Sequence, residues 1–196
     1  MIYLARHGET AFNRERRLQG HVDSPLTDLG VHQAHAVGGL LKDLVRDPAG
    51  WRLISSPLGR ARATAEIIAR QLGGGVEVEI EPRLIEITLG EDDGRLRGEL
   101  EAAYPDAFGR TGWIFDMPTA ERYDAVAARL ESWLADLPPE PERRVIAVSH
   151  GVTGRVLRGL YANLPRNRTG EQDAPQDAVF QLRGGAIGRI DCEPLA

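Results

Sequence analysis

The stretch that decides the fold is residues 2–10, which read IYLARHGET. Its apolar first half is long enough for one buried strand, and the glycine after the Arg-His pair allows the backbone to turn sharply. A second apolar run, residues 145–149 (VIAVS), also ends at a histidine and a glycine, His150-Gly151. In open α/β sheets, ligands bind outside the carboxyl ends of the strands. The two histidines therefore predict one site to which both ends of the chain contribute.

Working outward from this stretch, we expect strands and helices to alternate along the chain. Strands are expected at 2–5, 52–55, 76–80 and 145–149, with two short strands near the end, and helices at about 28–46, from Ser56-Pro57 to 72, at about 119–137 and at 152–162. Thr27, Ser56 and Thr119 are the expected N-caps. This alternation predicts a single α/β domain over residues 1–196, a three-layer α/β/α sandwich with a mainly parallel central sheet. Residues 95–118 lack a clear period and are expected to form an irregular excursion over the site that could act as a lid.

Composition limits the partners of the chain. At 196 residues with 42% hydrophobic and 27% charged residues, it suits one globular domain, and a net charge of −5 argues against nucleic-acid or anionic-membrane binding. Several arginines nevertheless gather near the motifs, which suits a small anionic ligand. They are Arg6, Arg14, Arg16, Arg17, Arg60 and Arg62, of which Arg14, Arg16, Arg17 and Arg62 could equally be solvated surface charges.

The sequence also predicts where the protein resides. The single cysteine, Cys192, lies near the end of the chain and fits a reducing compartment. The first strand begins at residue 2 and leaves no room for a signal peptide, and no apolar run approaches the length of a membrane span. We therefore expect a cytoplasmic protein with no membrane partner, and the sequence leaves its oligomeric state open.

Four further segments accompany the first motif and its Asn13. They are Gln19-Gly20 with Asp23, Pro25-Leu26-Thr27 and Gly30; Ser55 to Ala65; Leu84-Ile85-Glu86 with Gly90 and Gly94; and Ser149-His150-Gly151. Together these motifs resemble those of the histidine phosphatase superfamily, also called the phosphoglycerate mutase-like family. They fall in the family's order from residue 2 to about 160, whereas 95–118 and 163–196 match nothing specific. The resemblance implies the phosphoglycerate mutase-like fold and phosphoryl transfer through a phosphohistidine.

The resemblance also implies a phosphate site. His7 is the implied nucleophile, with one ring nitrogen fixed by a hydrogen bond that the backbone near Gly8 could accept. Arg6 and Arg60 are the implied phosphate clamps, since a guanidinium matches phosphate oxygens in pairs, and the helix start at Arg60 also favours an anion. The expected substrate- and phosphate-binding residues are Arg6, Asn13, Gln19, Gly20, Arg60, His150 and Gly151.

Two further roles are implied. His150 resembles the second histidine of the family, which hydrogen-bonds the transferring phosphoryl group. Glu86 is the implied general acid, which protonates the leaving alkoxide and then takes a proton from water. That work needs a raised pKa, which partial burial would supply. The competing carboxyl groups, Glu91, Asp92 and Asp93, are expected to be solvated, while Glu9 is expected to be structural.

No metal or cofactor is expected. His32 and His35 lie one helical turn apart, a spacing that could bind a metal, but no third ligand stands out and a solvated helix face is the preferred interpretation. His21 directly follows Gln19-Gly20. It is expected either near the substrate or only at the rim of the site.

The chain departs from the family pattern in two places. Ala120-Glu121-Arg122 stands where members often carry Gly-Glu-Ser, and the long basic insertion of the larger mutases is missing, with only Arg95, Arg97 and Arg110 available. The leading hypothesis is therefore a metal-independent phosphomonoester hydrolase that acts on a small phosphorylated metabolite. The alternatives are a phosphoglycerate mutase-type phosphotransferase and a catalytically idle member that binds phosphorylated ligands.

Overall fold

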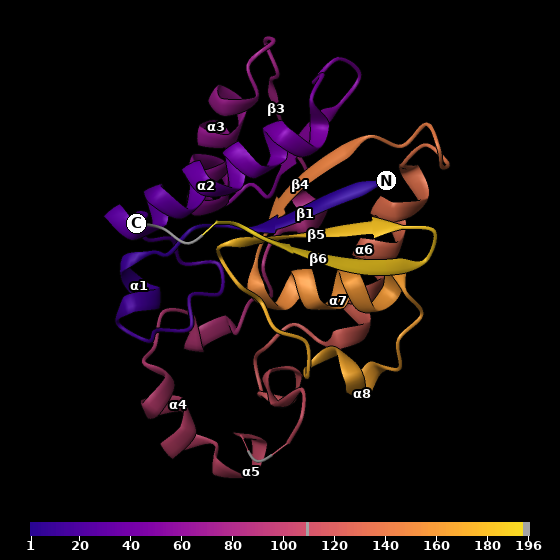
Figure 1. Ribbon diagram of the computed structural model, residues 1–196. Helices are drawn as coiled ribbons and strands as arrows, with labels where there is room; N and C mark the ends of the chain where they lie inside the picture. The colour runs from indigo at the N-terminus through magenta and orange to yellow at the C-terminus, as the bar shows by residue number, and fades with distance from the viewer. Residues whose placement is uncertain (109, 194–196) are drawn as a thin grey trace.

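The computed structural model describes residues 1–108 and 110–193. Its central sheet has the strand order β3-β2-β4-β1-β5-β6 (Figure 1). The strands are β1 (Ile2–Arg6), β2 (Arg52–Ser55), β3 (Val78–Ile80), β4 (Val145–Ser149), β5 (Ala178–Arg183) and β6 (Ala186–Asp191). The pairs among β1 to β4 are parallel, while β5 and β6 run antiparallel at one edge. The predicted mainly parallel sheet is thus confirmed, and the third strand starts two residues later than expected.

Helices cover both faces of this sheet. In Figure 1, α2 (Asp28–Val45) and α3 (Gly59–Leu72) lie on one side, and α6 (Tyr123–Asp136) and α7 (Gly151–Tyr161) lie on the other. The alternation of side chains along β1 divides the core accordingly. Tyr3 and Ala5 pack with α2 and α3, whereas Ile2 and Leu4 pack with α6 and α7. The predicted three-layer sandwich is therefore confirmed.

Two predicted helix starts are wrong, although Thr27 does cap α2. The third helix begins at Gly59 without a side-chain cap from its own N-cap residue. Its first amides instead donate to the carboxylate of Asp23, from a distant loop. The sixth helix begins at Tyr123, because the hydroxyl of Thr119 donates to Leu89 O at 2.6 Å rather than capping a helix. Both errors arise from contacts that are remote in sequence.

The excursion at 95–118 is more regular than expected. It contains α4 (Arg97–Ala103), α5 (Pro105–Phe108) and the 3-10 helix η3 (Trp113–Asp116), and its helices lie at the bottom of Figure 1. A small core of its own holds it together, with Leu100 and Met117 fully buried and three aromatic side chains packed around them. The other short helices are α1 (Ala11–Arg14), α8 (Arg166–Thr169) and the 3-10 helices η1 (Pro82–Leu84) and η2 (Gly90–Asp92).

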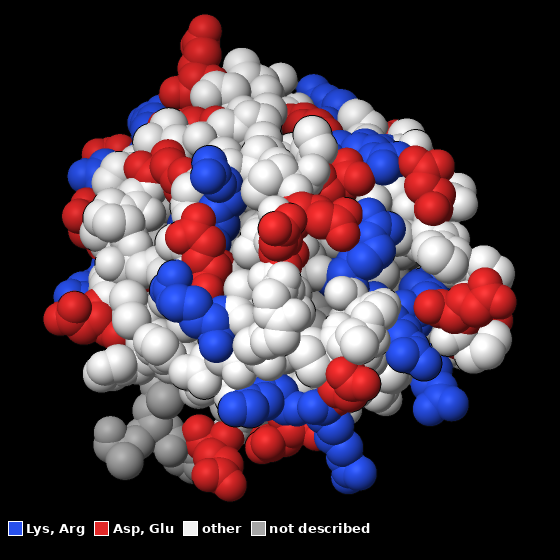
Figure 2. Space-filling view, turned by 90° about the horizontal axis from the view of Figure 1, so that it is seen from above, with Lys and Arg blue, Asp and Glu red and all other residues white. Residues whose placement is uncertain are grey.

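The surface carries charges of both signs. Figure 2, which looks down on the α2 and α3 side, shows acidic and basic side chains interspersed, without a continuous basic area on that face. Among the described residues, no helix combines the length and apolar character needed to cross a membrane.

Candidate active site

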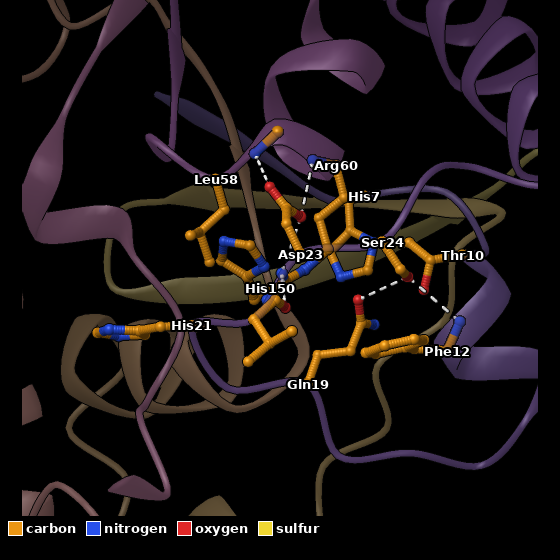
Figure 3. A network of polar contacts seen from close by, with 12 residues as sticks. His7, Thr10, Phe12, Gln19, His21, Asp23, Ser24, Leu58, Arg60 and His150 are labelled. Carbon is orange, nitrogen blue, oxygen red and sulfur yellow. Dashed lines mark hydrogen bonds and ion pairs between the residues drawn. The ribbon is translucent and has the colours of Figure 1, made fainter. Parts of the chain in front are cut away.

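Three adjacent parallel strands have their carboxyl ends on the same side of the sheet, and the residues that follow these strands meet there. His7 follows β1, His150 follows β4 and Ser56 follows β2. Backbone hydrogen bonds from His7 N to Ser149 O and from Ser56 N to Val148 O, each 3.0 Å, continue the sheet into this edge. The two histidine rings lie 5.1 Å apart between centroids, and both are buried (Figure 3). The structure thus brings the two ends of the chain together as the sequence predicts.

The ring of His7 is held in one orientation. Its Nδ1 lies 2.8 Å from Gly8 O, so Nδ1 carries the proton and Nε2 is left on the side that faces the cavity described below. A side chain at residue 8 would not fit, since an added Cβ would lie 2.2 Å from Gly30 O. Burial, with Arg6 and Arg60 nearby, holds the pKa of His7 well below its usual range. The imidazole is therefore neutral at pH 7, as a nucleophile must be.

The second histidine is held by a serine that sequence reasoning missed. His150 Nε2 lies 2.6 Å from Ser56 Oγ, and Nδ1 is buried without a partner among the described residues. Burial, together with His7 and Arg60, lowers the pKa of His150 well below its usual range, so this ring is neutral too. Because Ser56 Oγ accepts from Leu58 N, its own proton is free to donate to Nε2. When Ser56 donates to Nε2, the proton of His150 is on Nδ1.

The two predicted clamp arginines are anchored by carbonyl groups, and Arg60 is buried while Arg6 is partly buried. Arg6 Nη1 donates to Ala174 O at 2.6 Å, and burial lowers the pKa of Arg6 to about 10, which leaves it cationic. Arg60 donates through Nη2 to Gly20 O at 2.7 Å and pairs with Asp23 at 3.1 Å. Since Asp23 also takes the first amides of α3, the expectation that this helix start offers its amides to a phosphate is wrong.

Glu86 docks on the N-terminus of α7. Its carboxylate accepts from Val152 N at 3.1 Å, from Thr153 N at 2.9 Å and from the Thr153 hydroxyl at 3.0 Å. The side chain is only half-buried and also lines the cavity. These contacts fix the Glu86 side chain at the wall of the cavity.

The competing carboxyl groups have other partners. Asp92 is buried and bonds Arg95 and Tyr104, so the expectation that it is solvated is wrong. Asp93 accepts from Leu89 N at 2.7 Å and from the Thr88 hydroxyl, while Glu91 is exposed. None of the three lines the cavity that Glu86 lines.

A cavity of about 580 Å³ unites the predicted site residues. Every predicted residue except His150 lines it, namely Arg6, His7, Asn13, Gln19, Gly20, Arg60, Glu86 and Gly151. Asn13 Oδ1 accepts from Gln176, and Gln19 Oε1 accepts from Ser24 in the chain of hydrogen bonds drawn in Figure 3. Both amide oxygens are thus occupied, which leaves the NH₂ groups as donors. His150 is not part of this lining, and its ring centroid lies 5.1 Å from that of His7.

Sequence reasoning missed other residues of this site. Arg155 lines the cavity one helical turn after Gly151. Because residues four apart lie on the same face of a helix, the position of Arg155 relative to Gly151 could have indicated that it also faces the site. Gln176 donates to His7 O at 3.0 Å, and Ala174 accepts from Arg6. Both lie in the unassigned segment before β5, where no local pattern marks them.

The residues left open by the sequence lie outside the phosphate site. His21 is exposed and its Nε2 lies 2.8 Å from Glu86 O, which places it at the rim. His35 bonds Gln71, and His32 is exposed. Within residues 1–108 and 110–193, no group of three or more His, Cys, Asp or Glu side chains could hold a metal ion. Glu9 pairs with Arg14 and Thr27, in the structural role expected for it.

The departure from the family pattern has a local function here. Glu121 pairs with Arg129 at 3.0 Å, and Arg129 reaches the carbonyl of Arg83 behind the Glu86 segment. Arg122 donates to Phe115 O and Met117 O, so it braces the end of the excursion. Two of the three excursion arginines, Arg97 and Arg110, line the cavity.

Comparisons with known proteins show similarity in sequence and fold. The family model described as "Histidine phosphatase superfamily (branch 1)" matches residues 2–183. A relative from Photorhabdus laumondii, described as probable phosphoglycerate mutase GpmB, is 36% identical over 97% of this chain and 84% of its own length. The structure of Bacillus stearothermophilus YhfR aligns with a TM-score of 0.79 at 28% identity, over 100% of this chain and 97% of that one. The structure of mycobacterial glucosyl-3-phosphoglycerate phosphatase complexed with VO3 aligns with a TM-score of 0.77 at 26% identity, over 97% of this chain and 96% of that one.

Proposed function

We propose that this chain, which belongs to the histidine phosphatase superfamily, hydrolyses a small phosphomonoester through a phosphohistidine on His7. The observation that carries the proposal is the orientation of His7. Its proton is held on Nδ1 by Gly8 O, and its neutral Nε2 faces a cavity lined by Arg6 and Arg60. A neutral nucleophile beside fixed cations is what transfer of a phosphoryl dianion needs.

The reaction has two balanced steps. In the first, Nε2 of His7 bonds to phosphorus as the phosphorus–oxygen ester bond breaks, and Glu86 gives its proton to the leaving alkoxide. In the second, water attacks phosphorus, the phosphorus–nitrogen bond breaks, and Glu86 takes the proton of the water. Arg6 and Arg60 neutralise the transferring oxygens. For the first step Glu86 must carry a proton, which it takes from solvent, and the second step returns Glu86 to the same form.

His150 is proposed to donate from Nδ1 to a phosphoryl oxygen. A buried polar atom without a partner is costly, and a phosphoryl oxygen would supply the partner that Nδ1 lacks. This role depends on Ser56, because a hydroxyl that donates to Nε2 keeps the proton on Nδ1.

Ser56→Ala is therefore expected to lower kcat by about 10- to 100-fold, within the range for losing one fixed transition-state donor. Nitrogen-15 chemical shifts of the His150 ring are expected to show a change from the Nδ1–H tautomer to a mixture. Ser55→Ala is the matched control, since the neighbouring buried hydroxyl bonds Ser56 O and does not touch His150. An unchanged His150 tautomer in Ser56→Ala would show that Ser56 does not hold the proton of His150 on Nδ1.

A mutase is the second candidate function. Curated relatives are described as probable phosphoglycerate mutases. The cavity also holds more arginines than the predicted clamp pair, since Arg17, Arg97, Arg110 and Arg155 line it too. A mutase must keep water away from the phosphohistidine until transfer is complete. The excursion that covers the cavity is short, so we favour water as the acceptor.

The two candidates predict different products. With 3-phosphoglycerate and a trace of 2,3-bisphosphoglycerate, we expect free phosphate to form faster than 2-phosphoglycerate. Both products can be followed in one experiment by phosphorus NMR. Isomerisation that outruns phosphate release by about tenfold, roughly 1.4 kcal/mol of preference, would reverse the choice in favour of the mutase.

The proposal also predicts that no metal takes part. Arg6 and Arg60 already supply the charge neutralisation that Mg²⁺ supplies in other phosphoryl-transfer enzymes. Exhaustive chelation is expected to leave the rate within about twofold, a difference of roughly 0.4 kcal/mol in the barrier. Loss of activity that one divalent ion restores would contradict this expectation.

A further inference from the structure

A short segment before β5 holds both members of the Arg-His pair. In residues 173–176, which we call the anchor segment, Ala174 O accepts from Arg6 Nη1 at 2.6 Å. Gln176 Nε2 donates to His7 O at 3.0 Å. The anchor segment is neither helix nor strand. Its position therefore depends on the side chains that hold it against the rest of the protein.

Arg158, on α7, holds the start of the anchor segment. Its side chain is buried, and its Nη2 donates to Asp173 O. Its Nη1 lies 3.6 Å from Asp173 Oδ1, and its Nε donates to Gly154 O at 3.3 Å. The guanidinium also lies over the ring of Phe180, 3.6 Å from the ring centroid. Arg158 is thus fixed on several sides, and it fixes the backbone one residue before Ala174.

Stability alone does not explain an arginine at this position. Burial lowers the pKa of Arg158 to about 10, with Asp173 acting in the opposite direction, so the guanidinium is cationic at pH 7. Removing a cation from water is costly, and an apolar residue of similar volume at such a site is often neutral or stabilising. What the guanidinium adds is a fixed donor to the backbone of the anchor segment.

Arg158 is connected to the active site without lining it. Arg6 and Ala174 line the active-site cavity, and Arg158 does not. All three line a second, small cavity on the other side of Arg6 from no residue of the excursion, together with Phe180. The carbonyl groups of Asp173 and Ala174 belong to consecutive planar peptide units, so a shift of the first moves the second. The connection from Arg158 to Arg6 therefore runs through one stretch of backbone.

We propose that Arg158 is a positioning residue for phosphoryl transfer, which holds Asp173 O so that Ala174 O aims the guanidinium of Arg6 at the phosphoryl oxygens. This proposal rests on the proposed phosphatase function. Donors that stabilise a transition state act best when they are fixed before the reaction, and a misplacement of about 1 Å can cost about 100-fold in rate.

The test is a double-mutant cycle between Arg158 and Arg6. Arg158→Met is expected to lower kcat/KM for an aryl phosphate by about 10- to 100-fold. It is also expected to weaken the binding of inorganic phosphate by about tenfold, as for one hydrogen bond to a charged group. In the Arg6→Met background the same substitution is expected to cost less than about twofold, because the side chain that it positions is gone. Losses that add in the double variant would overturn the proposal, since a merely structural arginine would act independently of Arg6.

Two further variants separate positioning from folding. Arg158→Lys keeps the charge without the planar fork, and it is expected to recover part of the lost phosphate affinity. Pro175→Gly loosens the anchor segment without changing Arg158, because glycine lacks the fixed φ of proline, and it is expected to weaken phosphate binding at least threefold. If Arg158→Met does not fold, Pro175→Gly takes its place in the cycle with Arg6. Unchanged phosphate binding in both Arg158→Lys and Pro175→Gly would contradict the proposal.

Arg189→Met is the matched control. Arg189 pairs with the carboxylate of Asp173, as Arg158 does, but its side chain is exposed and it does not bond the backbone oxygen of Asp173. Since an exposed ion pair contributes little, this variant is expected to keep phosphate affinity and kcat/KM within about twofold of the wild type. A loss as large as that in Arg158→Met would overturn the assignment to Arg158.

The outcome stays separate from that of the phosphatase function. Calorimetric binding of inorganic phosphate measures the whole cycle without turnover. Absence of phosphate release from every ester, an aryl phosphate included, would defeat the proposed function. Additive losses of phosphate affinity in the cycle would defeat the positioning role of Arg158 alone.

Discussion

His7→Asn is expected to lower the turnover of every phosphomonoester by at least about 10⁴-fold, roughly 5.5 kcal/mol in the barrier. The loss is this large because no second nucleophile can take over. His150 is the nearest imidazole, but its Nε2 bonds Ser56 and its ring does not line the cavity. The measurement is kcat on an aryl phosphate, paired with a search for the covalent adduct. Wild type given labelled substrate and quenched without acid is expected to show one acid-labile phosphoryl group per chain, on His7.

His32→Asn is the matched control, since His32 is exposed on α2 and does not line the cavity. It is expected to keep the wild-type rate and the adduct. Substantial turnover in His7→Asn, or an adduct mapped to any other residue, would contradict the covalent mechanism. An aryl phosphate is the right substrate here because its leaving group needs no proton, which isolates the loss of the nucleophile from any disturbance of Glu86.

The parts of this protein that the sequence predicts are those encoded by local patterns. The apolar runs that became β1, β2 and β4 are bounded by their own turn residues, and Thr27 caps α2 from within its own segment. The residues at the ends of these strands then meet because parallel strands share one carboxyl edge. For the same reason, eight of the nine predicted site residues line one cavity.

The parts that the sequence does not predict depend on partners remote in the chain. The cap of α3 comes from Asp23, 36 residues before Gly59. Arg6 is fixed by Ala174 and His7 by Gln176, across separations of 168 and 169 residues. A backbone carbonyl or a lone glutamine in a loop has no signature of its own. The segment before β5 therefore looked uninformative, although it anchors both halves of the Arg-His pair.

The same distant contacts explain why the excursion at 95–118 was misjudged. Its helices are short, and they are held by Leu100 and Met117 packing on Leu89 rather than by a long amphipathic face. Arg97 lies over the rings of Phe108 and Trp113, at 5.4 and 5.5 Å, on the cavity side of this small core. A segment that looked aperiodic thus contributes an ordered wall to the cavity.

Glu86→Gln is the second large effect that we expect, and it should depend on the leaving group. An alkyl phosphate is expected to lose about 10³-fold in the rate of ester cleavage, within the range for a positioned general acid, whereas an aryl phosphate should lose less than about tenfold. Glutamine keeps one oxygen, which can still accept from Thr153 N, but its NH₂ group replaces the oxygen that accepts from Val152 N. Part of the contact with α7 is therefore retained while the proton donor is lost.

Single-turnover rates of ester cleavage for a series of phosphates with rising alcohol pKa would measure this dependence, which steady-state rates could mask if hydrolysis of the phosphohistidine were limiting. Glu91→Gln, which changes an exposed carboxylate of the same loop, is the control and is expected to leave the slope of the series unchanged. A steeper dependence of the cleavage rate on the alcohol pKa in Glu86→Gln, but not in Glu91→Gln, would identify Glu86 as the proton donor. Equal losses across the series would mean that Glu86 only holds the N-terminus of α7 in place, and another proton source would then be needed for the leaving alkoxide.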